Sequence, residues 1–154
     1  VSQEFVQQSA GEEGEYQPVV LVADDSSVAR NQIKRTLDQL GIECVLVKDG
    51  RQALDQLTQW ADDGQSIALH DRLFMVISDI EMPEMDGYTF TTEVRKDPRL
   101  SELHILLHTS LSGVFNRAMV EKVGANDFIA KFQPDELAKT VLERLKHWRS
   151  ARAA

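Results

Sequence analysis

The stretch from Leu73 to Gly87 constrains the fold more than any other part of the chain. Leu73 to Ile77 form an apolar run that is too short for a buried helix and apolar on both faces, which is typical of a central parallel strand. Asp79 follows this run, and Pro83 and Gly87 then prevent a strand or a helix from continuing smoothly. Asp79 is therefore predicted at the carboxyl end of a buried strand, which is the edge of a parallel sheet where ligands bind.

Four further segments have the length and composition of strands, and a helix-like segment follows each of them. These segments are Val19–Ala23, Ile42–Val47, His104–Thr109 and Asp127–Ala130. Apolar residues recur at helical spacing after each one, and Gly41 and Gly124 are predicted to end two of the helices. Strands that alternate with helices predict an α/β fold, with one five-stranded parallel sheet and helices on both faces.

The chain length and composition indicate one domain. With 154 residues the chain can bury well over half of its unfolded surface. Residues 18–150 are predicted to form the domain, and residues 1–17, which are rich in Gln, Glu, Gly and Ser, a flexible linker or arm. Residues 62–72 are long and polar for a connection, so that either a helix extends into them or a surface insertion lies there.

The net charge and the hydropathy of the chain argue against two classes of partner, nucleic acids and membranes. The net charge of −8 argues against nonspecific nucleic-acid binding, because the phosphate backbone would repel an acidic surface. No apolar run approaches the roughly 20 residues that a membrane helix needs, and no secretory segment appears near the start. We therefore expect a cytoplasmic protein without membrane insertion.

Polar side chains stand at the ends of four predicted strands: Asp24 and Asp25, Asp79, Thr109 and Lys131. Three carboxylates that converge on one pocket repel one another unless a cation is present. Oxygen ligands without His or Cys favour a hard divalent cation, and an open site suits Mg²⁺ better than Ca²⁺. An aspartate held beside Mg²⁺ can act as a nucleophile towards a phosphohistidine.

This set of residues resembles the response-regulator receiver family over about Pro18 to Trp148. The strand ends match in order, and so do Met82-Pro83 and Asp86-Gly87 after the central aspartate and Gly124-Ala125 before the last strand. The resemblance implies a doubly wound, flavodoxin-like sheet with the strand order 2-1-3-4-5. It also implies a signalling phosphoacceptor that catalyses only its own phosphorylation and dephosphorylation.

The resemblance assigns a role to each site residue. Asp79 would accept the phosphoryl group, while Asp25, Asp79 and the backbone carbonyl of Glu81 would bind Mg²⁺ directly and Asp24 would bind it through water. Lys131 and the Thr109 hydroxyl would each contact a phosphoryl oxygen. Thr109 and Phe128 would form the switch that reports phosphorylation.

Two departures from the family pattern bear on these roles. The residue after Lys131 is usually a proline with a cis bond, but here it is Phe132, and a cis bond before a non-proline residue costs about 2.5 to 4 kcal/mol. We therefore predict a trans bond. Glu81 and Leu111 stand two residues after Asp79 and Thr109, where they flank the path of the hydrolytic water, so that phosphoryl lifetime does not transfer from relatives.

Several segments are most similar to the receiver of a CheV-type chemotaxis coupling protein, among them Val28-Ala29-Arg30 and Lys131-Phe-Gln-Pro-Asp-Glu-Leu. That similarity implies a CheA-type histidine kinase as the partner and a CheW-like coupling domain before the receiver. The alternatives are a stand-alone response regulator and, from other classes, a Mg²⁺-dependent aspartyl-phosphate hydrolase or a flavin carrier. The acidic strand ends disfavour the flavin, whose phosphate needs hydrogen-bond donors there.

Each site residue also has a purely structural interpretation. Asp24 and Asp25 could cap the first helix, Thr109 could satisfy a strand end, Lys131 could be solvated and Phe128 could belong to the core. Four such coincidences at one sheet edge are improbable together. For Phe128 alone, a role in the core and a role in the switch are about equally probable. His104 and His108 are about 13 Å apart along one strand, too far to share a metal, and both are interpreted as structural.

Overall fold

The computed structural model describes residues 17–62, 69, 71–110 and 117–153. Within these ranges five parallel strands form one sheet in the order β2-β1-β3-β4-β5, which confirms the predicted topology. The strands are β1 (Val19–Ala23), β2 (Glu43–Val47), β3 (Leu73–Asp79), β4 (Ile105–Thr109) and β5 (Asp127–Ala130). The predicted arm falls almost wholly on residues outside the described ranges, as does most of the connection at 62–72.

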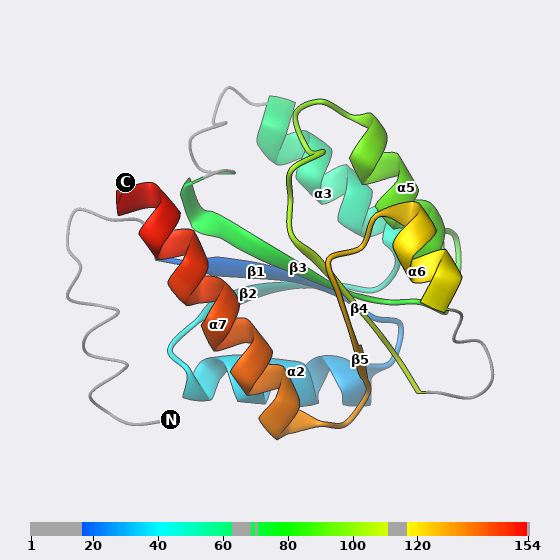
Figure 1. The fold of residues 1–154 in the computed structure, drawn as a ribbon. Coiled ribbons are helices and arrows are strands. Elements are labelled where there is room, and N and C mark those ends of the chain that lie inside the picture. The colour runs from blue at the N-terminus through cyan, green and yellow to red at the C-terminus, as the bar shows by residue number, and fades with distance from the viewer. Residues whose placement is uncertain (1–16, 63–68, 70, 111–116, 154) are drawn as a thin grey trace.

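Helices cover both faces of the sheet (Figure 1). One face carries α2 (Ser27–Gln39) and α7 (Pro134–Ala153), and the other carries α3 (Gly50–Asp62), α5 (Gly87–Lys96) and α6 (Arg117–Val123). Each face has its own core of buried apolar side chains. From β1 the chain adds β2 on one side of the sheet and then β3, β4 and β5 on the other. At such a switch point a cleft opens at the carboxyl ends of the two central strands, β1 and β3.

The central strands are the most deeply buried elements of the molecule. All seven residues of β3 and all five of β1 are buried, as expected for strands that carry helices on both faces. Neither strand therefore has a solvent-facing side, and the first groups to reach water lie beyond their carboxyl ends. Asp79, the last residue of β3, is buried with the rest of the strand.

Local sequence signals explain where the helices around the site begin and end. The Ser26 side chain caps α2 by accepting from the Ala29 N–H at 3.2 Å, and Asp86 caps α5 by accepting from the Thr89 N–H at 2.7 Å. Gly41 and Gly124 follow α2 and α6 with positive φ, as predicted for glycines that end helices. The two caps fix the loops after β1 and β3, which carry the acidic residues.

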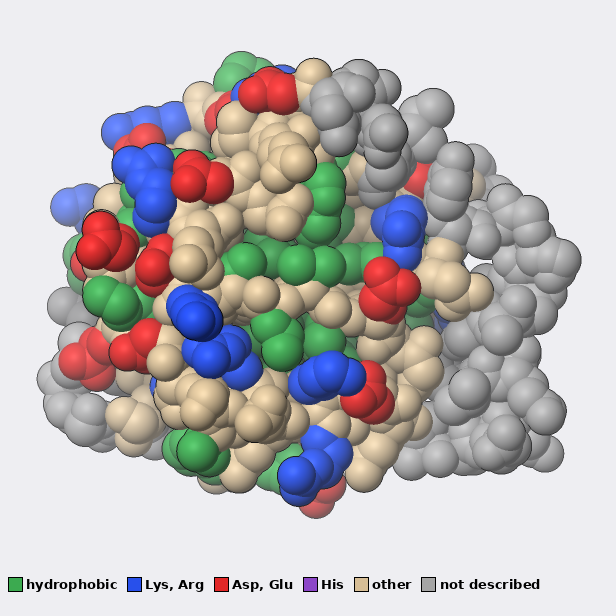
Figure 2. All heavy atoms as spheres, turned by 180° about the vertical axis from the view of Figure 1, so that it is seen from behind, with side chains coloured by type: hydrophobic (Ala, Val, Ile, Leu, Met, Phe, Trp, Pro, Cys, Tyr) green, Lys and Arg blue, Asp and Glu red, His purple; other side chains and the backbone are tan. Residues whose placement is uncertain are grey.

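The edge strand β2 is covered less completely than the central strands. Glu43 is exposed and the other four residues of β2 are half-buried. From behind, Figure 2 shows a strip of apolar side chains bordered by basic and acidic ones, with the two signs of charge interspersed. No helix within the described ranges is both long and apolar enough to cross a membrane.

Candidate functional site

Three aspartates meet at the carboxyl edge of the sheet. Asp24 and Asp25 follow β1, Asp79 ends β3, and one carboxylate oxygen of each lies within 4.8 Å of the others. Asp24 is fully buried and Asp79 is 3% exposed, whereas Asp25 is exposed. Two carboxylates are thus taken out of water while the third faces it, which leaves the cluster open on one side.

Lys131 provides the positive charge nearest to this cluster. Its Nζ lies 3.0 Å from Asp24 Oδ2 and 3.1 Å from Asp79 Oδ2, and its side chain is 10% exposed. The Lys131 N–H also donates to the Thr109 carbonyl at 2.8 Å, which ties the loop after β5 to the end of β4. Burial on its own would lower the pKa of Lys131, but the pairs with Asp24 and Asp79 raise it, so the ammonium stays charged.

The surroundings of Asp79 disfavour the negative charge of its carboxylate. Burial and the nearby charge of Asp24 raise the pKa of the Asp79 carboxyl from 3.8 to about 6, although Lys131 and the Ile80 N–H oppose the shift. The Ile80 N–H donates to Asp79 Oδ1 at 2.8 Å, while Oδ2 faces Lys131. The carboxylate is therefore held in one orientation and gains from any further cation nearby.

The donor set fits a hard divalent cation. Three carboxylates contribute oxygen ligands only, and the buried Asp24 Oδ2 has no hydrogen-bond partner among the described residues beyond its ion pair with Lys131. Asp25 and Glu81 line an open hollow beside the cluster together with Ile80, Met82, Asp86 and Tyr88. Oxygen ligands around an open position are the preferred setting of Mg²⁺, which keeps several of its waters.

Thr109 and Phe128 lie on the neighbouring strands β4 and β5. Thr109 is 1% exposed, and its hydroxyl has no hydrogen-bond partner within the described part of the chain. Phe128 is partly buried and packs against the core under α3, α5 and α6. Leu111 lies outside the described residues.

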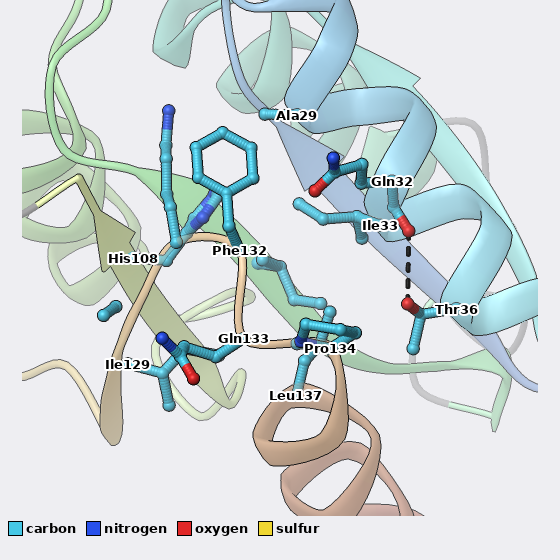
Figure 3. Close-up of a pocket in the computed structure, with 13 residues that line it drawn as sticks. Ala29, Gln32, Ile33, Thr36, His108, Ile129, Phe132, Gln133, Pro134 and Leu137 are labelled. Carbon is cyan, nitrogen blue, oxygen red and sulfur yellow. Dashed lines mark hydrogen bonds between the residues drawn. The ribbon is translucent and has the colours of Figure 1, made fainter.

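The loop after β5 adopts a geometry that sequence patterns did not indicate. No cis peptide bond occurs in the described residues, which confirms the predicted trans bond between Lys131 and Phe132. Phe132 has a φ of 62° and is 54% exposed, so that an aromatic residue occupies a conformation that favours glycine or asparagine. It lies at the rim of a pocket between α2 and α7 (Figure 3).

His108 belongs to the site, although its sequence position suggested only a structural role. Its Cα is paired in register with Asp79 on one side and Ile129 on the other, and paired residues of parallel strands project to the same face. Its Nε2 lies 3.3 Å from Asp24 Oδ2. Burial, with the nearby Lys131 charge, lowers the pKa of His108 to about 3, so the imidazole is neutral. Aligning the predicted ends of β3 and β4 would have paired Asp79 with Thr109, so this neighbour was visible only once the register was known.

His104, the other histidine near β4, lies away from the aspartate cluster. Its Nε2 is 2.5 Å from Asp127 Oδ2, at the opposite end of the strand, and its side chain is 20% exposed. This contact agrees with the structural interpretation of His104.

A comparison with known families decides the class of this site. The profile described as response regulator receiver domain matches residues 20–142. The chain belongs to the response-regulator receiver family. Among curated receivers, it is 32% identical over 126 residues to the chemotaxis protein CheV3 of Helicobacter pylori, a match that covers 79% of this chain and 39% of that protein. It is 35% identical over 125 residues to the chemotaxis protein CheY1 of Helicobacter pylori, covering 80% of this chain and 93% of CheY1.

Solved receiver structures agree with the observed fold. The chemotaxis protein CheY4 of Vibrio cholerae superposes with a TM-score of 0.67 at 30% identity, covering 83% of this chain and 98% of that one. The receiver domain of a histidine kinase from Syntrophus aciditrophicus gives a TM-score of 0.71 at 29% identity, covering 84% and 91%. The chain spans about two fifths of the length of the CheV relatives that it matches.

Proposed function

We propose that this receiver accepts a phosphoryl group on Asp79 from a phosphohistidine of a histidine kinase. The observation that carries the proposal is the placement of Asp79, whose buried carboxylate lies beside two further aspartates and 3.1 Å from the Lys131 ammonium. In the transfer, an Asp79 oxygen forms a bond to phosphorus while the bond from phosphorus to the histidine nitrogen breaks. The nitrogen keeps the electron pair, and the acyl phosphate that forms is the signal.

The aspartates would hold the Mg²⁺ ion that this transfer needs. Asp25 and Asp79 would bind it directly with the Glu81 carbonyl, and Asp24 would bind it through water. When bound, the ion supplies positive charge against the phosphoryl oxygens and the carboxylates. Its presence would also offset the repulsion between Asp24 and Asp79 that raises the pKa of Asp79.

Lys131 and Thr109 complete the set of groups that would meet the phosphoryl oxygens. Lys131 is already at the Asp79 carboxylate and neutralises charge there. The buried Thr109 hydroxyl lacks a hydrogen-bond partner among the described residues, and such an atom is costly to leave unpaired. A phosphoryl oxygen on Asp79 would give this hydroxyl an acceptor and so draw Thr109 towards the site.

The phosphorylated receiver would tune the coupling of chemoreceptors to a CheA-type kinase. Similarity to CheV proteins supports this role, and a CheW-like coupling domain would then precede the receiver in the full-length chain. Similarity to CheY1 at 35% identity supports the alternative, a stand-alone response regulator, equally well. The sequence of the full-length protein upstream of Val1 separates the two: a coupling domain supports the first and its absence the second.

Phosphoryl acceptance is tested by incubating the protein with acetyl phosphate and Mg²⁺ and measuring the intact mass. We expect a gain of one phosphoryl group in wild type, its loss with a chelator, and its loss in Asp79→Asn. Asp55→Asn, which alters an exposed aspartate on α3, is the matched control and should be phosphorylated as wild type. Phosphorylation of Asp79→Asn at the wild-type rate would refute the assignment of Asp79.

A further inference from the structure

His108 lies between the aspartate cluster and the pocket between α2 and α7. Figure 3 shows His108 on β4 at this pocket, with Phe132 at the rim and Ala29 and Ile33 of α2 opposite. Its side chain is 5% exposed, so the imidazole has little access to water. A buried polar ring of this kind needs a partner within the protein.

His108 faces a carboxylate oxygen of Asp24 that has room for a further hydrogen-bond donor. His108 Nε2 has no hydrogen-bond partner among the described residues, and it lies 3.3 Å from Asp24 Oδ2. Asp24 Oδ2 forms an ion pair with Lys131 Nζ at 3.0 Å but has no other partner within these residues. A neutral imidazole carries one N–H and one lone pair. A lone pair on Nε2 would repel the carboxylate, whereas an N–H there attracts it. The proton therefore belongs on Nε2.

We propose that His108 is a positioning residue for Asp24, whose carboxylate it holds through an Nε2–H donated to Oδ2 while Lys131 turns to a phosphoryl group. The role rests on the proposed function, because it concerns the aspartate that would bind Mg²⁺ through water. The Ser26 N–H already donates to Asp24 Oδ1 at 2.8 Å. Ser26 and His108 together would restrain both oxygens of the carboxylate.

Lys131 cannot provide the same restraint by itself. Its ammonium is divided between Asp24 and Asp79 at almost equal distances, and it sits on a flexible four-carbon stem. A phosphoryl oxygen on Asp79 competes for that ammonium and weakens its hold on Asp24. His108 is fixed by its strand and its burial, so its N–H stays in place throughout. Residues that orient metal-binding groups in this way commonly change metal affinity by tenfold to a hundredfold when they are replaced.

Three variants separate this role from simple packing. His108→Leu removes the N–H while keeping an apolar side chain of similar bulk, and His108→Gln can place an amide N–H near the position of Nε2. His104→Leu removes the other histidine near β4, which pairs with Asp127 away from the site, and serves as the matched control. We expect His108→Leu to weaken binding of Mg²⁺ by about tenfold, His108→Gln to stay within about threefold of wild type, and His104→Leu to bind as wild type.

Binding is measured by titrating each protein with Mg²⁺ alone, and then with beryllofluoride in the presence of Mg²⁺, while backbone amide resonances are followed. The nitrogen chemical shifts of His108 in the metal-free protein report which ring nitrogen carries the proton. A proton on Nε2 supports the proposal even if His108→Leu fails to fold. A proton on Nδ1, or unchanged affinities in a folded His108→Leu, would overturn it. If wild type itself binds no Mg²⁺, the proposed function fails first and this role fails with it.

Discussion

At the scale of single residues, the raised pKa of Asp79 predicts how stability depends on pH. The folded chain binds the Asp79 proton more tightly than the unfolded chain, because burial and Asp24 oppose the charge. Stability of the metal-free protein should therefore fall as pH rises from about 4 to about 6. A pKa shift from 3.8 to about 6 lowers the free energy of unfolding by roughly 2 to 3 kcal/mol, and the full loss is reached above pH 6.

Asp79→Asn should remove this cost. In metal-free buffer with a chelator, we expect the variant to exceed wild type in free energy of unfolding by about 2 kcal/mol at pH 7.5 and to lose the advantage near pH 4. Urea unfolding across this range measures the difference, with Asp55→Asn as the control. Added Mg²⁺ should stabilise wild type and not Asp79→Asn. Parallel pH profiles for wild type and Asp79→Asn would contradict the assigned cause.

Phe132 offers a second prediction, because its backbone conformation is costly and its side chain is half exposed. Asparagine tolerates a φ of 62° far better than alanine does, while both substitutions remove the ring. We expect Phe132→Asn to be more stable than Phe132→Ala by about 1 kcal/mol, measured by denaturant unfolding. Equal stabilities would show that the loop relaxes to a negative φ when the ring is absent.

The residues that sequence reasoning placed correctly at this edge are those that end apolar runs. Asp24 and Lys131 directly follow strands and Asp79 ends one, so their position in the sheet depended only on where the apolar runs stop. His108 was missed because it lies inside its strand and reaches Asp24 only through the register of β3 against β4. Register depends on packing of the whole sheet, and a single strand does not reveal it.

At the scale of elements, the strands and helices lie close to where the periodicity predicted them. The strands β1, β3 and β5 have the predicted bounds, and β2 and β4 each begin one residue later than predicted. The predicted course of the helix before Gly124 falls partly on residues 111–116, outside the described residues. Local signals sufficed for these bounds because each apolar run is bounded by polar residues, glycine or proline.

What fixes the elements to one another was not visible in the sequence. Arg95 of α5 donates to the Gly124, Leu103 and Ser101 carbonyls and to Asn126 Oδ1, at 2.7 to 3.0 Å. These bonds tie α5 to the residue that follows α6 and to the segments that precede β4 and β5. A basic residue near the end of a helix has many possible partners, so no pattern in the chain indicates this set.

The start of α5 predicts an unusual effect of a glycine substitution. A Cβ at Gly87 would lie 2.3 Å from the Asp79 carbonyl oxygen, a backbone atom that cannot move without displacing the end of β3. Replacing a helical glycine with alanine ordinarily stabilises a protein, but here overpacking should cost about 1 to 3 kcal/mol. We expect Gly87→Ala to lower the thermal midpoint and to weaken Mg²⁺ binding.

Thr89→Ala is the control for the same helix turn, because Thr89 is exposed and its replacement leaves the loop after β3 in place. It should keep wild-type Mg²⁺ affinity. If Gly87→Ala matched Thr89→Ala in both stability and affinity, the close approach of α5 to the end of β3 would not constrain the site.

At the scale of the whole molecule, the sheet provides a route from the aspartate cluster to a distant surface. Thr109 ends β4 and Lys131 follows β5, the two strands on the side of the sheet away from β2. Their backbones are joined by the bond from the Lys131 N–H to the Thr109 carbonyl. A phosphoryl group that draws on both side chains would therefore act on β4, β5 and the helices beside them together.

The resulting prediction is that phosphorylation of Asp79 changes the surface formed by α6, β5 and α7, and that this surface contacts the partner. Movement of Thr109 towards the site would leave space for Phe128, which is only partly buried against the core. A ligand shifts such an equilibrium only by its differential affinity for the two states, and charge-assisted hydrogen bonds of about 1.5 to 3 kcal/mol each suffice for a tenfold shift.

Amide hydrogen exchange with and without beryllofluoride and Mg²⁺ tests this route, because beryllofluoride on Asp79 stands for the phosphoryl group. We expect protection to change along α6 and β5 as well as around Asp25 and Asp79. Asp79→Asn is the control that cannot carry the phosphoryl mimic, and Thr109→Val keeps the shape of the strand end while removing the hydroxyl. The variant should therefore retain the changes near Asp25 and lose those in α6. Changes that stay near Asp25 and Asp79 in wild type would contradict the route, since the strand ends would then bind the phosphoryl group without passing its effect to the helices.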